Sequence, residues 1–121
     1  MVKEPIKQRG ESSIALGPKT YRLKTSFAAF VRIEESLSIG ILGLLTRWRQ
    51  SDVRHKDIAT VVYHMAIEGA EFGTNIDYDD IGTGLMVGGN EEFLKRVIEV
   101  MKILNVALSS GSKEAGAVNP N

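Results

Sequence analysis

The sequence contains no cysteine, which excludes disulfide bonds and thiolate metal sites. It also lacks an excess of either charge, because 15 basic residues are balanced by 15 acidic ones. A neutral chain produces no net field that would concentrate nucleic acid or anionic lipid at its surface. We therefore expect neither nucleic acid nor a membrane among its partners.

Long apolar segments are missing as well. The longest nearly apolar stretch, residues 39–45, is far shorter than the roughly 20 residues that a membrane-spanning helix needs. Residues 1–5 contain no apolar run of the kind found in secretory signals. Together with the lack of cysteine, these features predict a soluble protein of the reducing cytoplasm.

What the sequence does contain is a change of hydrophobic period within residues 20–34. Before this change, two short β-prone runs flank the turn signal Gly17-Pro18-Lys19, which predicts a β-hairpin over residues 11–24. After it, apolar residues recur at helical spacing. The predicted fold class is α+β, mostly α, with an N-terminal two-stranded β-hairpin followed by a bundle of about five helices.

The chain of 121 residues is long enough for one domain with its own core, which we place at residues 11–109. Residues 1–10 have a mild excess of basic side chains and are expected to form a flexible N-terminus. Residues 110–121 have too few apolar side chains to offset the entropy of ordering them. The sequence therefore predicts a disordered tail there.

Capping residues and glycines predict where the helices begin and end. Thr25 or Ser26 can cap the first helix, and Asp77 can cap the fourth. Gly69 is the expected left-handed cap of the third helix, whose broad apolar arc makes it the predicted central helix. The five expected helices cover residues 25–36, a segment after Ser38, and residues 56–68, 77–87 and 90–109.

No group of side chains has the spacing of a catalytic or metal-binding site. His55 and His64 are too far apart in sequence to share one helix face as metal ligands. The acidic residues within 77–80 fit the first turn of a helix better than a calcium loop. A small-molecule or enzymatic site built from Asp57, Tyr63 and His64 would lack a paired titrating group. We therefore expect no metal, no cofactor and no catalytic residue, and we interpret the chain as non-enzymatic.

Glu34 is a polar residue that the helical projection places on the otherwise apolar face of the first helix. A carboxylate in that position needs partners. We expect it to accept hydrogen bonds from free amides near Ser38 and Ile39, or to pair with Arg47 or Arg49. A single carboxylate without a second titrating group gives little support for acid–base catalysis.

The order of short apolar and capping motifs along the chain resembles that of a known family. The motifs follow the predicted hairpin and are Thr25-Ser-Phe-Ala-Ala-Phe30, Ile33-Glu34, Leu44-Leu45 with Arg47, Asp57-Ile-Ala59, Gly69-Ala70, Asp80-Ile-Gly82, Gly88 and Phe93-Leu94. Over about residues 10 to 109, the chain resembles the tail assembly proteins of gene transfer agents and related siphophage-like prophages. This family is described both as tail assembly chaperones and as tail tube proteins. The chain departs from the family pattern at Ser38, where we would expect a glycine, and at Ile67-Glu-Gly69.

The resemblance implies a helical adaptor in the cytoplasm of a bacterial host. Such an adaptor would bind the long tape-measure protein, keep its apolar helices from aggregating and help tail tube subunits assemble around it. The resemblance also leaves open the alternative that the chain is a structural tail tube component that self-assembles into rings. For that alternative, the edge strands of the hairpin over residues 11–24 could provide the joint between copies, so a homo-oligomer is possible.

A partner-binding groove is predicted beside the fourth and fifth helices. The apolar face of the fifth helix, which includes Leu94 and Ile98, spans about half of its circumference, more than the ~100° stripe needed to rest on a core. Methionines adapt to varied apolar partners. An amphipathic client helix would suit such a groove. The alternative is that these side chains only complete the core. The candidate residues are Leu85, Met86, Met101 and Leu104, with Ile103 and Val106 on the rim.

Overall fold

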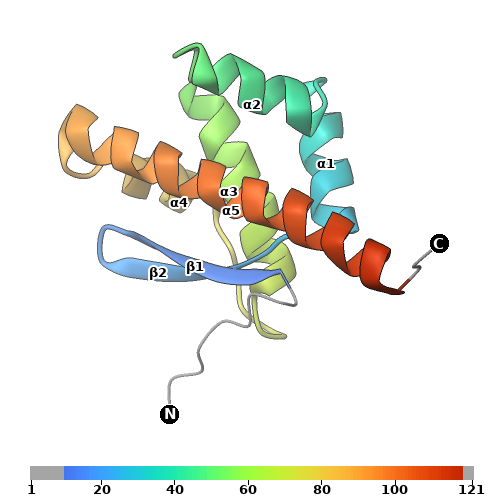
Figure 1. Cartoon of the computed structure of the whole chain (residues 1–121). Helices are drawn as coiled ribbons and strands as arrows, with labels where there is room; N and C mark the ends of the chain where they lie inside the picture. Colours follow the sequence, from blue (N-terminus) through green and yellow to red (C-terminus); the bar gives the residue numbers. More distant parts are fainter. Residues whose placement is uncertain (1–9, 119–121) are drawn as a thin grey trace.

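A computed structural model describes residues 10–118 of the chain, with side chains described as far as Ser109. Its elements are β1 (Glu11–Leu16), β2 (Lys19–Lys24), α1 (Phe27–Leu37), α2 (Ile41–Arg49), α3 (His55–Gly69), α4 (Tyr78–Met86) and α5 (Gly89–Val118). The predicted α+β, mostly α fold, with a hairpin followed by five helices, is therefore confirmed. Figure 1 shows the hairpin below the helices and α5 running along the outside of the molecule.

The predictions for the two ends of the chain have different outcomes. Residues 1–9 and 119–121, which belong to the predicted flexible N-terminus and disordered tail, lie outside the described residues. The backbone of α5, however, is helical as far as Val118. The helix therefore extends past the end predicted near Ser109.

The hairpin forms as its turn signal indicates. β1 and β2 are antiparallel with Leu16 opposite Lys19, so the turn contains only Gly17 and Pro18. Gly17 adopts a φ of +65°, a left-handed conformation that glycine reaches without a steric penalty. Because side chains alternate along a strand, one face of the hairpin is apolar and packs under the helices. That buried face consists of Ile14, Leu16, Tyr21 and Leu23.

Two of the predicted helix caps are present. The Ser26 side chain accepts a hydrogen bond from the Ala29 amide at 3.1 Å and begins α1. Asp77 accepts hydrogen bonds from the amides of Asp79 and Asp80 and begins α4. These short polar side chains satisfy amides that no earlier turn of the helix can reach, so local sequence determines both starting points.

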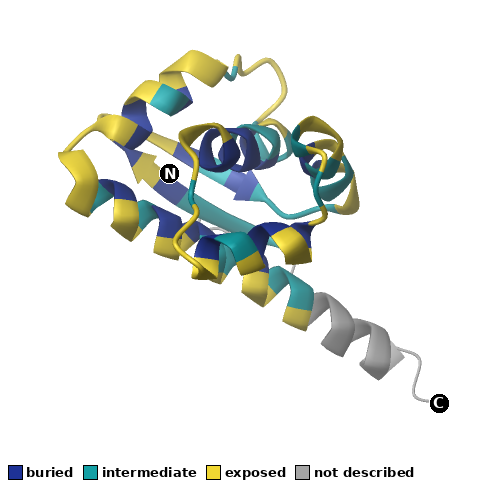
Figure 2. Cartoon of the chain, turned by 90° about the horizontal axis from the view of Figure 1, so that it is seen from above, coloured by how far each residue is buried: buried dark blue, intermediate teal, exposed yellow. Residues whose placement is uncertain are grey.

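The third helix, α3, is the central helix, as predicted. It packs against β2, α1, α4 and α5, and Figure 2 shows buried segments of the chain in the middle of the molecule with exposed ones around them. Contact with so many neighbours explains why its buried surface is wider than one stripe. The buried apolar residues of α3 are Ile58, Ala59, Val61, Val62, Met65 and Ala66.

Two glycines allow helices to approach the hairpin closely. The predicted role of Gly69 as a left-handed cap is wrong, because Gly69 is the last residue of α3 and Ala70 is its C-cap. A Cβ atom at Gly69 would lie 2.5 Å from the Arg22 carbonyl oxygen, so glycine is needed for contact between α3 and β2. In α4, a Cβ atom at Gly84 would lie 2.8 Å from the Leu16 Cβ.

Replacing each of two glycines in α4 by alanine tests this close packing. We expect Gly84→Ala to lower the free energy of unfolding by about 1–3 kcal/mol, because the added methyl group overlaps Leu16. Gly82 is the matched control, since a Cβ atom there meets no atom within 4 Å. Gly82→Ala should raise stability by up to about 1 kcal/mol, because alanine is the better helix former. Denaturant unfolding of both variants measures the difference, and equal effects would contradict the close contact.

Candidate functional site

Two of the predicted partner-binding residues belong to the core. Leu85 on α4 and Leu104 on α5 are fully buried, so neither is available to a partner. The prediction is corrected at these two positions. The reason is that α5 packs on its neighbours through residues spaced at three and four along the helix, and Leu104 continues the row formed by Phe93, Val97 and Val100.

The other four predicted residues differ in exposure. Met86, at the end of α4, is 64% exposed and Val106 is 50% exposed. Met101 and Ile103 are partly buried and pack against the core. Ile103, which was predicted to lie on the rim of the groove, therefore packs against the core. The core-facing side of α5 is shifted around the helix from the projected apolar face, because α5 contacts β1 and α4 as well as α3.

A row of exposed apolar side chains runs along one side of α5. Leu94 is 55% exposed and Ile98 is 53% exposed, although the sequence assigned both to the core-facing surface. Met101, partly buried, is the next residue in the same row, because residues at i, i+4 and i+7 lie one above another on a helix. We call Leu94, Ile98 and Met101 the α5 stripe. Periodicity alone shows that the apolar face of α5 is wider than core contact requires, but it does not show which side of that face the neighbouring elements leave uncovered.

The turn between α4 and α5 is held in place by a side chain of α5 that lies outside this row. The Arg96 guanidinium donates hydrogen bonds to the carbonyl oxygens of Leu85 at 3.0 Å and Val87 at 2.6 Å. Gly88 and Gly89 follow with positive φ angles of 92° and 80°. The resulting sharp turn leaves the side chains of Met86 and Val87 exposed at the end of α4.

Glu34 caps α2 from the end of the preceding helix. Its carboxylate accepts a hydrogen bond from the Ile41 amide at 2.9 Å. Ile41 is the first residue of α2, two positions after the nearest amide named from the sequence. Gly40, at the N-cap position, has no side chain to make this bond itself, so Glu34 replaces the usual local cap.

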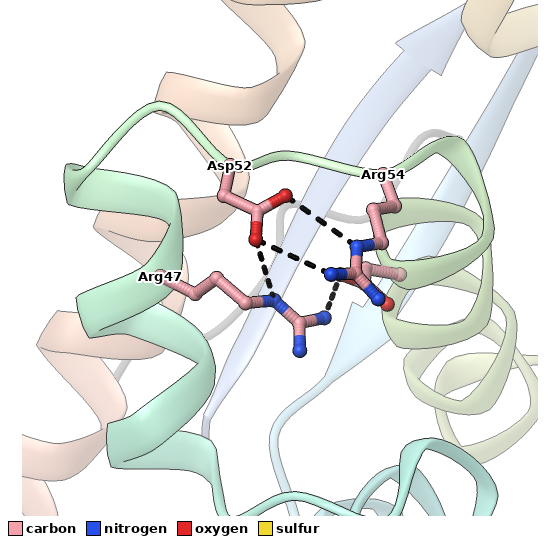
Figure 3. A network of polar contacts seen from close by, with 4 residues as sticks. Arg47, Asp52 and Arg54 are labelled. Carbon is pink, nitrogen blue, oxygen red and sulfur yellow. Dashed lines mark hydrogen bonds and ion pairs between the residues drawn. The ribbon is translucent and has the colours of Figure 1, made fainter.

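A polar network connects the end of α2 with the start of α3 (Figure 3). The Arg47 side chain forms an ion pair with Asp57, whose side chain is only 5% exposed. Asp52 lies between two arginines, 3.8 Å from Arg47 Nε and 3.4 Å from Arg54. Each charged group in this network has an opposite charge beside it. We therefore assign the network to structure rather than to ligand binding.

Substitutions at the buried ion pair test that assignment. Removing one partner leaves an uncompensated charge, so we expect Arg47→Met to lower the free energy of unfolding by about 3–5 kcal/mol. The double variant Arg47→Met with Asp57→Leu should recover much of this loss, because it removes both charges. Urea unfolding of the two single variants and the double variant gives the coupling. Strictly additive losses would show that the two side chains do not interact.

The residues of the possible small-molecule site are not brought together as a catalytic group. Asp57 pairs with Arg47, while His64 Nε2 lies 3.1 Å from the Ser36 hydroxyl on α1. Tyr63 contacts His64 and Tyr78 edge to face, with ring centroids 5.3 and 5.4 Å apart. Apart from the Tyr63–His64 contact within α3, each of these contacts joins α3 to another helix of the bundle. Burial, and to a lesser extent the nearby Arg32 guanidinium, lowers the pKa of His64 below its usual 6.5.

The lowered pKa of His64 predicts that stability depends on pH. The unfolded chain binds a proton at this side chain near pH 6.5, whereas the folded chain binds it only at lower pH. Folding stability should therefore be complete above pH 6.5 and should fall as the pH is lowered through that value. His64→Gln should make the stability curve flatter between pH 7.5 and the folded-state pKa. Denaturant unfolding at a series of pH values tests this, and an unchanged slope in the variant would contradict it.

A cavity lies between β2 and the loop that precedes α4. Its volume is about 400 Å³, and its walls include Tyr21, Ala66 and Ile76. Charged side chains at the cavity are paired with opposite charges: Lys19 lies 2.8 Å from Asp80, and Arg22 lies 3.6 Å from Glu71. Because these charges already have partners, the cavity does not point to one class of charged ligand.

Among the described residues, no three histidine, aspartate or glutamate side chains are placed to hold a metal ion. Within the same part of the chain, no helix has the length and apolar composition needed to cross a membrane. Comparison with known proteins finds no protein-family model, no curated protein and no solved structure that matches the chain.

Proposed function

We propose that the chain is a non-enzymatic tail assembly chaperone of a phage or gene transfer agent-like prophage. It would act in the cytoplasm of the bacterial host and bind the tape-measure protein during tail assembly. Two features support this proposal: the resemblance over about residues 10 to 109, and the exposed α5 stripe on an ordered helix. The stripe is the single structural observation on which the proposal depends.

The geometry of the stripe suits a helical client. Apolar anchors at i, i+4 and i+7 lie along one line of a helix and match the spacing with which an amphipathic client presents its own anchors. Within the stripe, Met101 adds a side chain that adjusts to differently shaped partners. Leu94 and Ile98 are already about half-buried, so each would contribute about 1 kcal/mol on full burial.

A tape-measure protein with long apolar helices would present many such segments. Individually weak contacts at the stripe would then allow the chaperone to bind at several places and to be displaced when tail tube subunits assemble. In this interpretation the chain performs no chemistry, since its role is to keep apolar client surface away from water. The predicted residues Ile103 and Val106 would lie at the margin of the contact, with Val106 the more exposed of the two.

Co-expression with the tape-measure protein of the same tail gene cluster tests the proposal. The client should be soluble and co-purify with the wild-type chain, and Leu94→Lys and Ile98→Lys should each weaken binding by about tenfold or more because a charge would enter an apolar contact. Phe27→Lys is the matched control, since Phe27 is 85% exposed but lies at the start of α1. Circular dichroism should show unchanged melting for all three variants.

Two results would count against the chaperone. Full binding by folded Leu94→Lys and Ile98→Lys variants would exclude the stripe as the client surface. A client that stays insoluble while the chain alone forms large rings would instead support the structural tail tube component.

A further inference from the structure

The two edges of the hairpin differ in what approaches their outward backbone groups. In an antiparallel pair of strands, every second pair of opposite residues is joined by backbone hydrogen bonds. The residues of the pairs in between direct their N–H and C=O groups outward, away from the partner strand. Leu16 and Lys19 flank a two-residue turn and so form a bonded pair. The Thr25 amide, which donates to the Gly10 carbonyl at 2.8 Å, fits the same alternation at the other end. The outward groups therefore belong to Ser13 and Ala15 on β1 and to their opposite residues on β2.

The end of α3 crowds the edge of β2 at Arg22. The last residue of α3, Gly69, lies so close to the outward carbonyl of Arg22 that a Cβ atom would be 2.5 Å from the oxygen. The loop before α4 forms a cavity with residues 19–22 on the same strand. Within the described chain, no hydrogen bond beyond the β1–β2 pairing involves the outward backbone groups of Ser13 and Ala15 on β1, or those of Thr20 and Arg22 on β2. The four groups on β1 can pair with another strand, whereas Gly69 of α3 obstructs the β2 edge at the Arg22 carbonyl.

The side chains of the two strands also differ. Proteins protect exposed strand edges with lysine, proline or a bulge. β1 has none of these and is uncharged from Ser12 to Leu16, whereas β2 contains three basic residues. Pairing of β2 with β2 of another copy would place positive charges near each other, which is unfavourable. Pairing of β1 with itself creates no such conflict.

We propose that β1 pairs with β1 of a second copy of this chain, antiparallel about a two-fold axis at Ile14, to form a closed homodimer with a four-stranded sheet. In this register Ser13 lies opposite Ala15 of the second copy, and the two symmetric pairs form four backbone hydrogen bonds. Small side chains meet on the outer face of the sheet. Because α3 obstructs the β2 edge at Arg22, the dimer does not add a further strand there and does not grow into a filament.

This proposal is independent of the proposed function, because it uses the hairpin and not the α5 stripe. The interface is small, so we expect reversible dimerisation at the high protein concentrations used in NMR. Sedimentation equilibrium should then approach twice the chain mass of 13.3 kDa. A chain that stays monomeric over the whole concentration range, or forms larger rings, would overturn the proposal.

Amide hydrogen exchange tests the register without any substitution. The amides of Ser13 and Ala15 should exchange more slowly as the protein concentration rises, because they become hydrogen-bonded in the dimer. The Thr20 amide also points outward but from β2, so its exchange should not change with concentration. Protection that does not depend on concentration at Ser13 and Ala15 would overturn the proposal.

A matched pair of proline substitutions tests which edge is used. Ala15 and Thr20 lie directly opposite each other, so Ala15→Pro and Thr20→Pro each remove one outward N–H without removing a bond between β1 and β2. Circular dichroism checks that both variants fold. Ala15→Pro should remain monomeric, and Thr20→Pro should dimerise like the wild type. Dimerisation of folded Ala15→Pro, or loss of the dimer in both folded variants, would overturn the assignment to β1.

Discussion

The buried carboxylate of Asp57 determines how the first half of the helical domain is arranged. It lies in the first turn of α3, where the helix dipole favours a negative charge, but its burial requires a specific partner as well. Arg47 provides that partner from the last turn of α2. The chain between the two helices must therefore turn sharply, and Ser51 adopts a positive φ of 67° within it. The ion pair therefore ties the end of α2 to the start of α3.

Glu34 has a similar role at the other end of α2. Its carboxylate takes the place of a cap that Gly40 cannot supply, so α2 is held by polar contacts at both its first and last turns. These contacts also constrain α1, because Glu34 belongs to that helix. Buried polar groups thus select one arrangement of three helices that apolar packing alone would specify less strictly. The apolar core then adds most of the stability.

Local sequence signals predicted the helices and strands better than they predicted how these elements contact one another. The hairpin turn at Gly17 and the caps at Ser26 and Asp77 depend on residues within a few positions, so the sequence is sufficient to find them. The role predicted for Gly69 was wrong because glycine is needed there for close contact with β2, which lies some 45 residues earlier in the chain. The composition of residues 110–121 likewise did not predict that the backbone of α5 is helical as far as Val118.

The candidate surface shows the same limit more clearly. The excess width of the apolar face on α5 could be recognised from spacing, and it indicated that some side chains would be exposed. Which ones are exposed depends on where α4 and β1 lie against the helix, and this depends on the whole fold. Leu104 was therefore a candidate for the groove, with a core role as the alternative, and it is buried, whereas Leu94 and Ile98 were assigned to the core-facing side although they are exposed.

The position of the stripe on α5 also affects how a client could be bound. The same helix packs into the domain through Phe93, Val97 and Val100, so it is ordered before any partner arrives. A preformed helix does not lose backbone entropy on binding, and the free energy of apolar contact is then available for affinity. A disordered segment with the same apolar residues would have to fold first and would bind more weakly. The core contacts of α5 are therefore what would make a stripe of only three side chains useful to a chaperone.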